Sequence, residues 1–464
     1  MKLQVQGKTS KRQVRRVFGV GCFAILIAGV GGFFSLARMV REDSAKLPSD
    51  LERLRALGVP LTVDDLYKKS PTIPDSENAA KLYRRAFRAT EKLPTGLLFN
   101  QHPWRASSAA EKEKARDALV AIRPILSILR EATKLPHYDF DIDWGRSASV
   151  QFGFHQVPIE EGTMGYLLVY IDAEVSDRLK RGDLDGALDD LALDVQIARQ
   201  SPEYGSVFGN DWRTRTQEAV LDLLWQILVK HADDGDLLDK VDQLAKRIRL
   251  PKLSNLIETD FVRGRAVIVK ITSLSQSGLY ENMPAGFRKG IDNVFNSPGV
   301  KEAFEAKYVN TYLRLFNALS IDSEDWTGIH KAIVRINEQL EKDGSLDNLL
   351  AKKFAPEYNE IPGQYAQALA KQRMLLLSIE LIRRRKTTGR FPDALPQMGL
   401  VSIDPATERP FNYEREPFGF TLVSELHRFF PGNANSKTQS ASKLFDIRHT
   451  FSERASSSAP RQRS

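Results

Sequence analysis

The hydrophobic pattern of the chain begins with one long apolar segment. Residues 17–40 read VFGVGCFAILIAGVGGFFSLARMV, with no charged side chain before Arg38. An α-helix of about 20 apolar residues spans the roughly 30 Å hydrocarbon core of a bilayer. The segment therefore predicts a transmembrane helix over 17–40, with the rest of the chain on one side of the membrane.

The charges that flank this segment predict its orientation. Residues 1–16 carry six basic side chains and no acidic one, and basic flanks stay in the cytoplasm. We therefore expect a single-pass protein of the bacterial cytoplasmic membrane, with a basic cytoplasmic tail over 1–16 and an extracytoplasmic bulk. A cleaved signal peptide ending near Ser35-Leu36-Ala37 is the alternative, although the apolar core of a signal peptide is only about 7–15 residues long.

Small residues recur at a spacing of four within the apolar segment, at Ala24, Ala28 and Gly32. This spacing lets two transmembrane helices approach closely. Gly and Ala are also common in transmembrane helices that do not associate. The pattern thus leaves a homo-oligomer formed through these residues as one alternative.

Beyond residue 44, the apolar positions follow the helical period of 3.6 residues. One apolar stripe typical of an amphipathic helix is formed by Ala79, Leu82, Tyr83, Ala86 and Phe87. Segments 167–181 and 183–200 have the same period and predict a helical hairpin. We therefore expect an extracytoplasmic domain over 44–370 that is mainly α, either an antiparallel bundle or an irregular solenoid of helical hairpins.

Two local patterns refine this expectation. Thr62 and Asp65 have the spacing of a capping box, which predicts the start of a short helix. Residues 136–160 alternate apolar and polar positions and are rich in aromatic side chains. They predict extended or irregular chain that lies over the helices.

The C-terminal part combines a helical period with strand-like segments. A predicted helix over 371–385 is followed by TGRFPDAL (388–395), IDPATERP (403–410), FNY (411–413) and GFTLVS (419–424). This order resembles the tail of the major pseudopilins of type II secretion. Together with the segments Pro74 to Tyr83 and Arg181 to Ala187, it also resembles large membrane-anchored helical proteins of planctomycete-type bacteria, and this resemblance extends diffusely over most of the chain. The resemblance implies a small α+β module over 371–432. It does not extend to a calcium loop, because ELHRFFP (425–431) follows the last strand with a single carboxylate.

Composition and charge restrict the partners. The 464 residues are 42% hydrophobic and 27% charged, which is typical of a globular protein. Of the net charge of +8, residues 1–16 contribute +6 and the Ser-rich segment 433–464 contributes +4, which leaves −2 for residues 17–432. Because the main part of the chain is nearly neutral, we expect no nucleic-acid partner. The Ser-rich, basic composition of residues 433–464 predicts a disordered tail. Cys22 is the only cysteine, so the chain forms no intrachain disulfide.

The strongest candidate for chemistry is a set of alternating polar residues, His137, Asp139, Asp141 and Asp143. On a strand these side chains share one face and could hold a cation. The segment lacks the Gly and Glu of an EF-hand loop, and acids facing water are the simpler interpretation. We therefore predict no catalytic, cofactor-binding or metal-binding residue.

These observations lead to three functional hypotheses. The first is a non-catalytic interaction or scaffold protein of the cell envelope that binds other envelope proteins. The alternatives are an enzyme with a site built from dispersed residues near 137–160, and an accessory component of a pilus-like secretion system. The basic run Arg383–Lys386 is interpreted as a solvated helix end, with contact to anionic lipid as the alternative.

Overall fold

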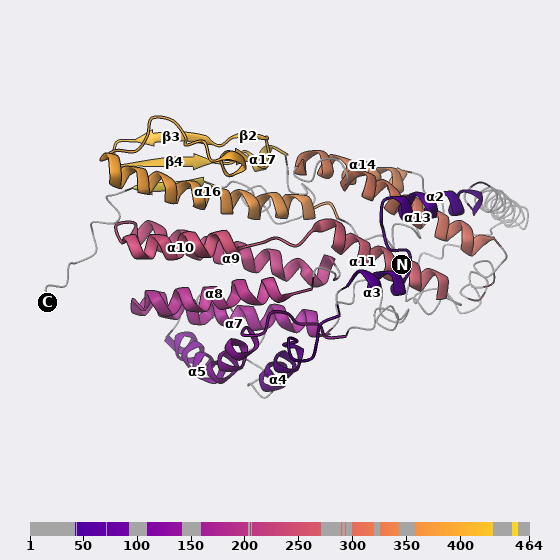
Figure 1. Cartoon of the computed structure of the whole chain (residues 1–464), viewed down its shortest axis with the longest axis horizontal. Coiled ribbons are helices and arrows are strands. Elements are labelled where there is room, and N and C mark those ends of the chain that lie inside the picture. Colours follow the sequence, from indigo (N-terminus) through magenta and orange to yellow (C-terminus); the bar gives the residue numbers. More distant parts are fainter. Residues whose placement is uncertain are drawn as a thin grey trace, which may run out of the picture.

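The computed structural model is mainly helical, with a small sheet region near the C-terminus (Figure 1). It describes residues 42, 44–70, 72–91, 109–141, 159–202, 205, 207–270, 289, 293, 299–319, 325–342, 358–429 and 448–452. The prediction of a mainly α fold with a small α+β part at the C-terminus is confirmed.

One half of the molecule is a stack of helices that run side by side. From one edge to the other, it contains α4 (Ala80–Thr90), α5 (Ala109–Ala132), α7 (Ile159–Arg181), α8 (Leu184–Gln200), α9 (Val207–His231), α10 (Gly235–Arg247) and α16 (Ile361–Thr388). The sheet covers α16 at the upper edge in Figure 1. The stack places the C-terminal strands far from α4 and α5.

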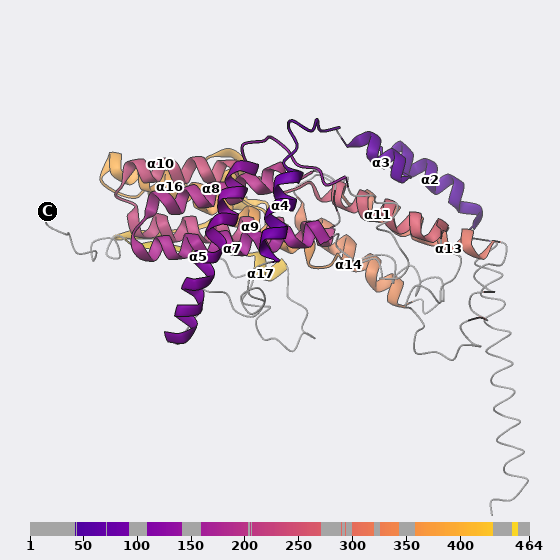
Figure 2. The same cartoon turned by 90° about the horizontal axis from the view of Figure 1, so that it is seen from below.

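The other half is built around α13 (Val300–Leu319). This helix packs against η1 (Ser44–Lys46) with α2 (Leu47–Ala56), against α11 (Leu253–Lys270) and against α14 (Trp326–Lys342), and α3 (Val63–Lys69) packs on α11 (Figure 2). The rings of Phe261 and Tyr308 stack with centroids 5.8 Å apart. The Tyr308 side chain also lies close to the α11 backbone at Gly264. Glycine allows this contact, because a Cβ there would lie 2.0 Å from the Tyr308 hydroxyl.

Local capping follows the sequence closely. Thr62 and Asp65 form the predicted capping box at the start of α3. The hairpin of α7 and α8 turns at Gly182, whose φ of 77° suits glycine. Asp183 then caps α8 by accepting a hydrogen bond from the Gly186 backbone N–H at 3.1 Å. Both caps satisfy backbone groups that a helix start leaves free.

Two helices begin earlier in the chain than the sequence predicts. The extended segment was expected to reach residue 160, yet α7 already begins at Ile159. The boundary between the domains at 370 and 371 falls inside α16, which begins at Ile361. This helix is buried on most of its faces, against α9, α10, α14 and the small strands. The C-terminal module therefore packs firmly on the helical domain and shares a helix with it.

The sheet region has two parts. β1 (Ile403–Asp404) and β2 (Arg409–Pro410) form an antiparallel pair after η6 (Gly399–Ser402), and β3 (Asn412–Glu416), β4 (Gly419–Val423) and β5 (Arg448–Ser452) form an antiparallel sheet in that order. β4 leads into the short helix α17 (Leu426–Phe429).

The prediction of a disordered tail over 433–464 is wrong for residues 448–452, which form β5. Phe451 pairs with Phe420 of β4, with ring centroids 5.6 Å apart, and also contacts Phe391. His449 stacks on Trp225 of α9 at 4.0 Å. Burial of these rings stabilises pairing with β4, which composition alone did not reveal.

The predicted membrane segment 17–40 lies outside the described residues, as do residues 1–16 and the small-residue positions Ala24, Ala28 and Gly32. Among the helices that the structure describes, none has the length and apolar character needed to span a membrane.

Candidate functional site

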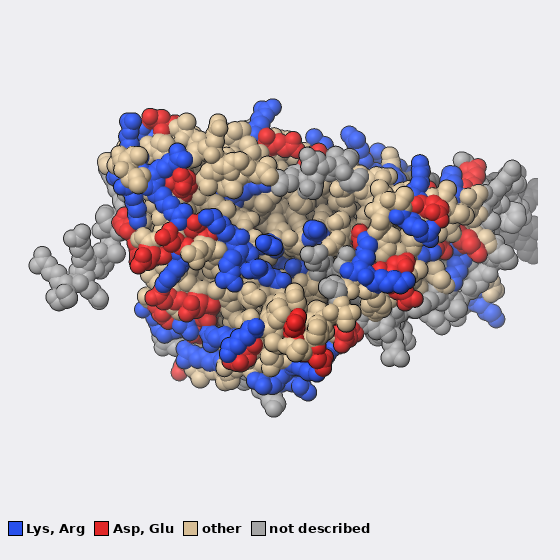
Figure 3. All heavy atoms as spheres, in the orientation of Figure 1, with Lys and Arg blue, Asp and Glu red and all other residues tan. Residues whose placement is uncertain are grey.

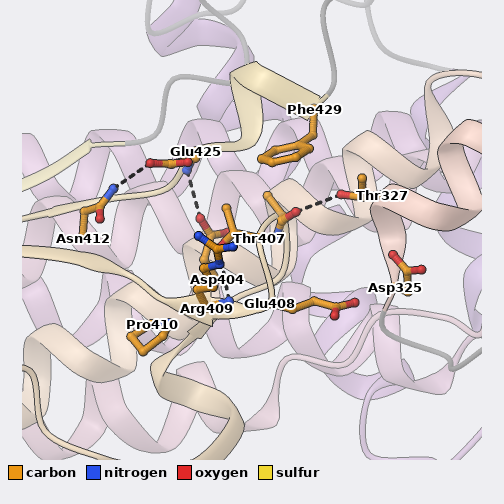
Figure 4. Close-up of a pocket in the computed structure, with 11 residues that line it drawn as sticks. Asp325, Thr327, Asp404, Thr407, Glu408, Arg409, Pro410, Asn412, Glu425 and Phe429 are labelled. Carbon is orange, nitrogen blue, oxygen red and sulfur yellow. Dashed lines mark hydrogen bonds between the residues drawn. The ribbon is translucent and has the colours of Figure 1, made fainter.

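A hollow of the described surface lies where the C-terminal module meets α14. We call it the acidic recess. Its volume is about 450 Å³, within the usual range of about 300–1,000 Å³ for ligand pockets. It is lined by Asp325, Thr327, Asp404, Ala406, Thr407, Glu408, Arg409, Pro410, Asn412, Glu425 and Phe429 (Figure 4).

Asp404 forms the floor of the acidic recess, with only 1% of its surface exposed. Its carboxylate accepts hydrogen bonds from the backbone N–H of Ala406 at 3.0 Å, the Ser424 hydroxyl at 2.9 Å and the backbone N–H of Glu425 at 2.9 Å. Burial raises the pKa of Asp404, and these three hydrogen bonds oppose that rise. The residue fastens the β1–β2 turn to the end of β4.

A second hydrogen bond fastens the sheet to the loop after α16. The Tyr413 hydroxyl donates to the Pro392 carbonyl at 2.7 Å. The IDP and GFTLVS segments are thus joined through Asp404 and Ser424, and the FPDAL and FNY segments through Tyr413. These contacts give a physical reason for the order of the C-terminal motifs, since each segment needs the next to satisfy its buried polar groups.

The β1–β2 turn directs Glu408 into the mouth of the acidic recess. Its φ of 57° lies in the left-handed region, which is unusual for a residue with a side chain. The backbone N–H groups of Thr407 and Glu408 both donate to the Asp404 carbonyl, at 3.2 and 2.9 Å. The turn thereby holds an exposed carboxylate in a fixed place at a cost in backbone energy.

We expect Glu408→Gly to raise the free energy of unfolding by about 1 kcal/mol, because glycine adopts a positive φ without strain. Urea unfolding measures the change. Glu414→Gly on β3 is the matched control and should lower stability, since glycine weakens a strand. If Glu408→Gly loses as much stability as the control, the positive φ of Glu408 costs no backbone energy.

The wall on the α14 side holds the module in place. The Thr327 hydroxyl donates to the Ala406 carbonyl at 2.8 Å. Asp325 caps α14 by accepting from the Gly328 backbone N–H at 2.7 Å. A Cβ at position 328 would lie 2.0 Å from the Asp325 carboxylate, so a side chain there would require this carboxylate to shift. The Asp325 carboxylate therefore stays beside the recess (Figure 4).

The rim completes an electrostatically negative hollow. Asn412 donates its side-chain N–H to the Glu425 carboxylate at 3.1 Å, and the Phe429 ring lies above the floor (Figure 4). Asp325, Glu408 and Glu425 add three partly or fully exposed carboxylates, against the single guanidinium of Arg409. The described residues that line the recess include neither histidine nor cysteine. Carboxylates beside an aromatic face suit a cationic group such as an ammonium or a guanidinium.

The residues that the sequence singled out near 137–143 have a different role. Asn78 accepts from the Asp139 backbone N–H and donates to the Asp139 carbonyl, both at 2.9 Å. The Asp139 carboxylate accepts from the Asp141 backbone N–H at 2.9 Å. These bonds fix the segment on α4, with Tyr138 and Phe140 packed against Tyr83.

No metal site results from this arrangement within the described part of the chain, where no group of three or more His, Cys, Asp or Glu is placed to hold an ion. Asp143 and the rest of 142–158 lie outside the described residues. The hypothesis of an enzyme site near 137–160 therefore gains no support from His137, Asp139 or Asp141.

Sequence reasoning missed a buried acidic cluster between α7 and α8. Asp190 is fully buried and pairs with Arg178 at 2.8 Å and with Arg130 of α5. One turn further along α8, the fully buried Asp194 faces Asp172 of α7. Burial raises the pKa of Asp172 to about 7 and that of Asp194 well above its ordinary value. The spacing of Asp190 and Asp194 on the apolar face of α8 was the available signal.

The basic run Arg383–Lys386 is largely paired. Arg383 forms ion pairs with Asp239 and Asp242 of α10, Arg384 pairs with Glu380 at 2.8 Å, and Lys386 donates to the Asp233 carbonyl at 3.0 Å. These contacts favour a structural role for the run over contact with anionic lipid.

No family model, no curated protein and no solved structure matches the chain. The resemblance of the C-terminal segment to pseudopilin tails therefore rests on its motifs alone.

Proposed function

We propose that the chain is a membrane-anchored protein of the bacterial cell envelope that acts as a non-catalytic scaffold. We further propose that the acidic recess receives a lysine or arginine side chain of a partner protein. The observation that carries this proposal is the convergence of Asp325, Glu408 and Glu425 around one rigid hollow beside Phe429.

Rigidity supports a binding role. The floor is fixed by the three hydrogen bonds to Asp404, and the wall by the bond from Thr327 to Ala406. A preformed site loses little conformational entropy when a partner binds. Glu408, the most exposed of the three carboxylates, faces solvent, so it can pair with an incoming cation.

Charge supports a cationic partner. The exposed carboxylates exceed the basic side chains in the lining by two, and Phe429 offers an aromatic face. A guanidinium or ammonium over such a face gains a cation–π interaction in addition to its ion pairs. The anchor predicted over 17–40 would hold the recess near other envelope proteins.

The test is capture of partners from membranes by the full-length protein after in-cell crosslinking. We expect the double variant Glu408→Lys, Glu425→Lys to recover at least tenfold less of the main partner than the wild type, because like charges then repel across the contact. Glu414→Lys, on an exposed position of β3 outside the recess, is the control and should recover the wild-type amount. Equal recovery by the double variant and the wild type would refute a binding role for the recess.

A further inference from the structure

Three arginines gather on one face of the helical stack. Arg199 lies near the end of α8, Arg247 ends α10, and Arg249 follows in the connection to α11, and all three are exposed. We call them the arginine patch. Figure 3 shows Lys and Arg side chains gathered over the middle of this face.

Two hydrogen bonds hold together the elements that carry these residues. The Arg247 guanidinium donates to the Gln196 side chain at 3.2 Å, one turn before Arg199 on α8. The Gln217 side chain of α9 donates to the Arg249 carbonyl at 2.6 Å, and this bond fixes the connection between α10 and α11. The patch is thus a product of the fold, because positions 199, 247 and 249 come from separate elements.

The described part of the chain places no compensating acid at the arginine patch. Within the described residues, no Asp or Glu lies within ion-pair distance of these three arginines, whereas nearby Lys240, Lys246 and Arg383 each have an acidic partner. Burial, and then the charges of Arg247 and Arg249, lower the pKa of Arg199. Like charges held this close disfavour folding unless an anion binds between them.

We propose that the arginine patch binds a phosphate-bearing anion. Guanidinium groups form paired hydrogen bonds with phosphate oxygens, and three of them match a group that carries two or more negative charges. The phosphate can belong to a free phosphate compound or to a lipid headgroup. The near-zero net charge of residues 17–432 did not indicate this site, because a net charge sums over the whole segment and does not report where basic side chains cluster.

The test is calorimetric titration of inorganic pyrophosphate into the full-length protein in neutral detergent micelles. We expect binding that weakens as salt rises, and at least tenfold weaker binding by Arg199→Gln, Arg247→Gln, Arg249→Gln. A matched control removes three exposed basic residues elsewhere, Arg85→Gln, Arg88→Gln, Lys180→Gln, and should bind within twofold of the wild type.

A second arm separates the two sources of phosphate. If a lipid is the ligand, micelles doped with phosphatidic acid raise the melting temperature of the wild type and of the control but not of the patch variant, while pyrophosphate has little effect. Without any anion, the patch variant should melt at or above the wild-type temperature, because repulsion is removed. The proposal is wrong if neither ligand binds, or if the control loses as much binding as the patch variant. Should the triple variant fail to fold, Arg199→Gln alone should weaken binding about threefold, and unchanged binding would overturn the proposal.

Discussion

Asp404→Ala should lower the free energy of unfolding of the C-terminal module by about 3–5 kcal/mol, since it leaves three hydrogen-bond donors without their acceptor. Those donors are the backbone N–H groups of Ala406 and Glu425 and the Ser424 hydroxyl. Hydrogen exchange of peptides covering 399–429 measures the loss directly. Asp404→Asn should have a smaller effect, because the amide retains one acceptor oxygen.

Asp393→Ala is the control for this experiment. Asp393 lies in the same module but is exposed, and it pairs with Arg415. Exposed ion pairs contribute little to stability, so exchange in 399–429 should stay near that of the wild type. If Asp404→Ala exchanges no faster than Asp393→Ala, the carboxylate does not hold the floor of the acidic recess.

Asp172→Asn should make the protein more stable at pH 8 and reduce the fall in stability between pH 4 and pH 8. In the folded protein burial raises the pKa of Asp172 to about 7, whereas an unfolded chain has about 3.9. The contribution of Asp172 to the free energy of unfolding is therefore greatest below about pH 4, and it declines as the pH rises through 7. Asparagine keeps the shape and donates to Asp194 at any pH.

The difference between a pKa of about 7 and one of about 3.9 is roughly three units, and each unit corresponds to about 1.4 kcal/mol, so we expect a gain of up to about 4 kcal/mol at pH 8 and little change at pH 4. Urea unfolding at both pH values measures it. Asp189→Asn, on the exposed side of α8, is the control and should leave the pH dependence intact. A wild-type protein whose stability does not fall between pH 4 and pH 8 would contradict the raised pKa of Asp172.

Local patterns predicted the elements well where local forces determine them. The stripe of Ala79, Tyr83 and Ala86 is buried as its spacing indicates, and Thr62 and Asp183 cap the helices that follow them. Strand β5 could not be predicted in the same way. Its stability comes from Phe451 against Phe420 and from His449 against Trp225, contacts between distant parts of the chain.

In the candidate site, too, some residues belong to local motifs and others come from distant parts of the chain. The motif residues Asp404 and Ser424 were visible in the sequence, but the recess also needs Asp325 and Thr327, about 80 residues earlier in the chain. The period-two acids Asp139 and Asp141 looked more like a site and instead fix a local turn. Side chains from different helices meet only once the helices are packed.

The most direct measurement of the central claim is site-specific photo-crosslinking in living cells from within the acidic recess. A photoreactive residue in place of Thr407 lines the hollow, and one in place of Glu414 faces solvent on the same module. We expect position 407 to label a partner peptide at or beside a lysine or arginine, and position 414 not to label it. Labelling of the same peptides from both positions, or none from position 407, would contradict it.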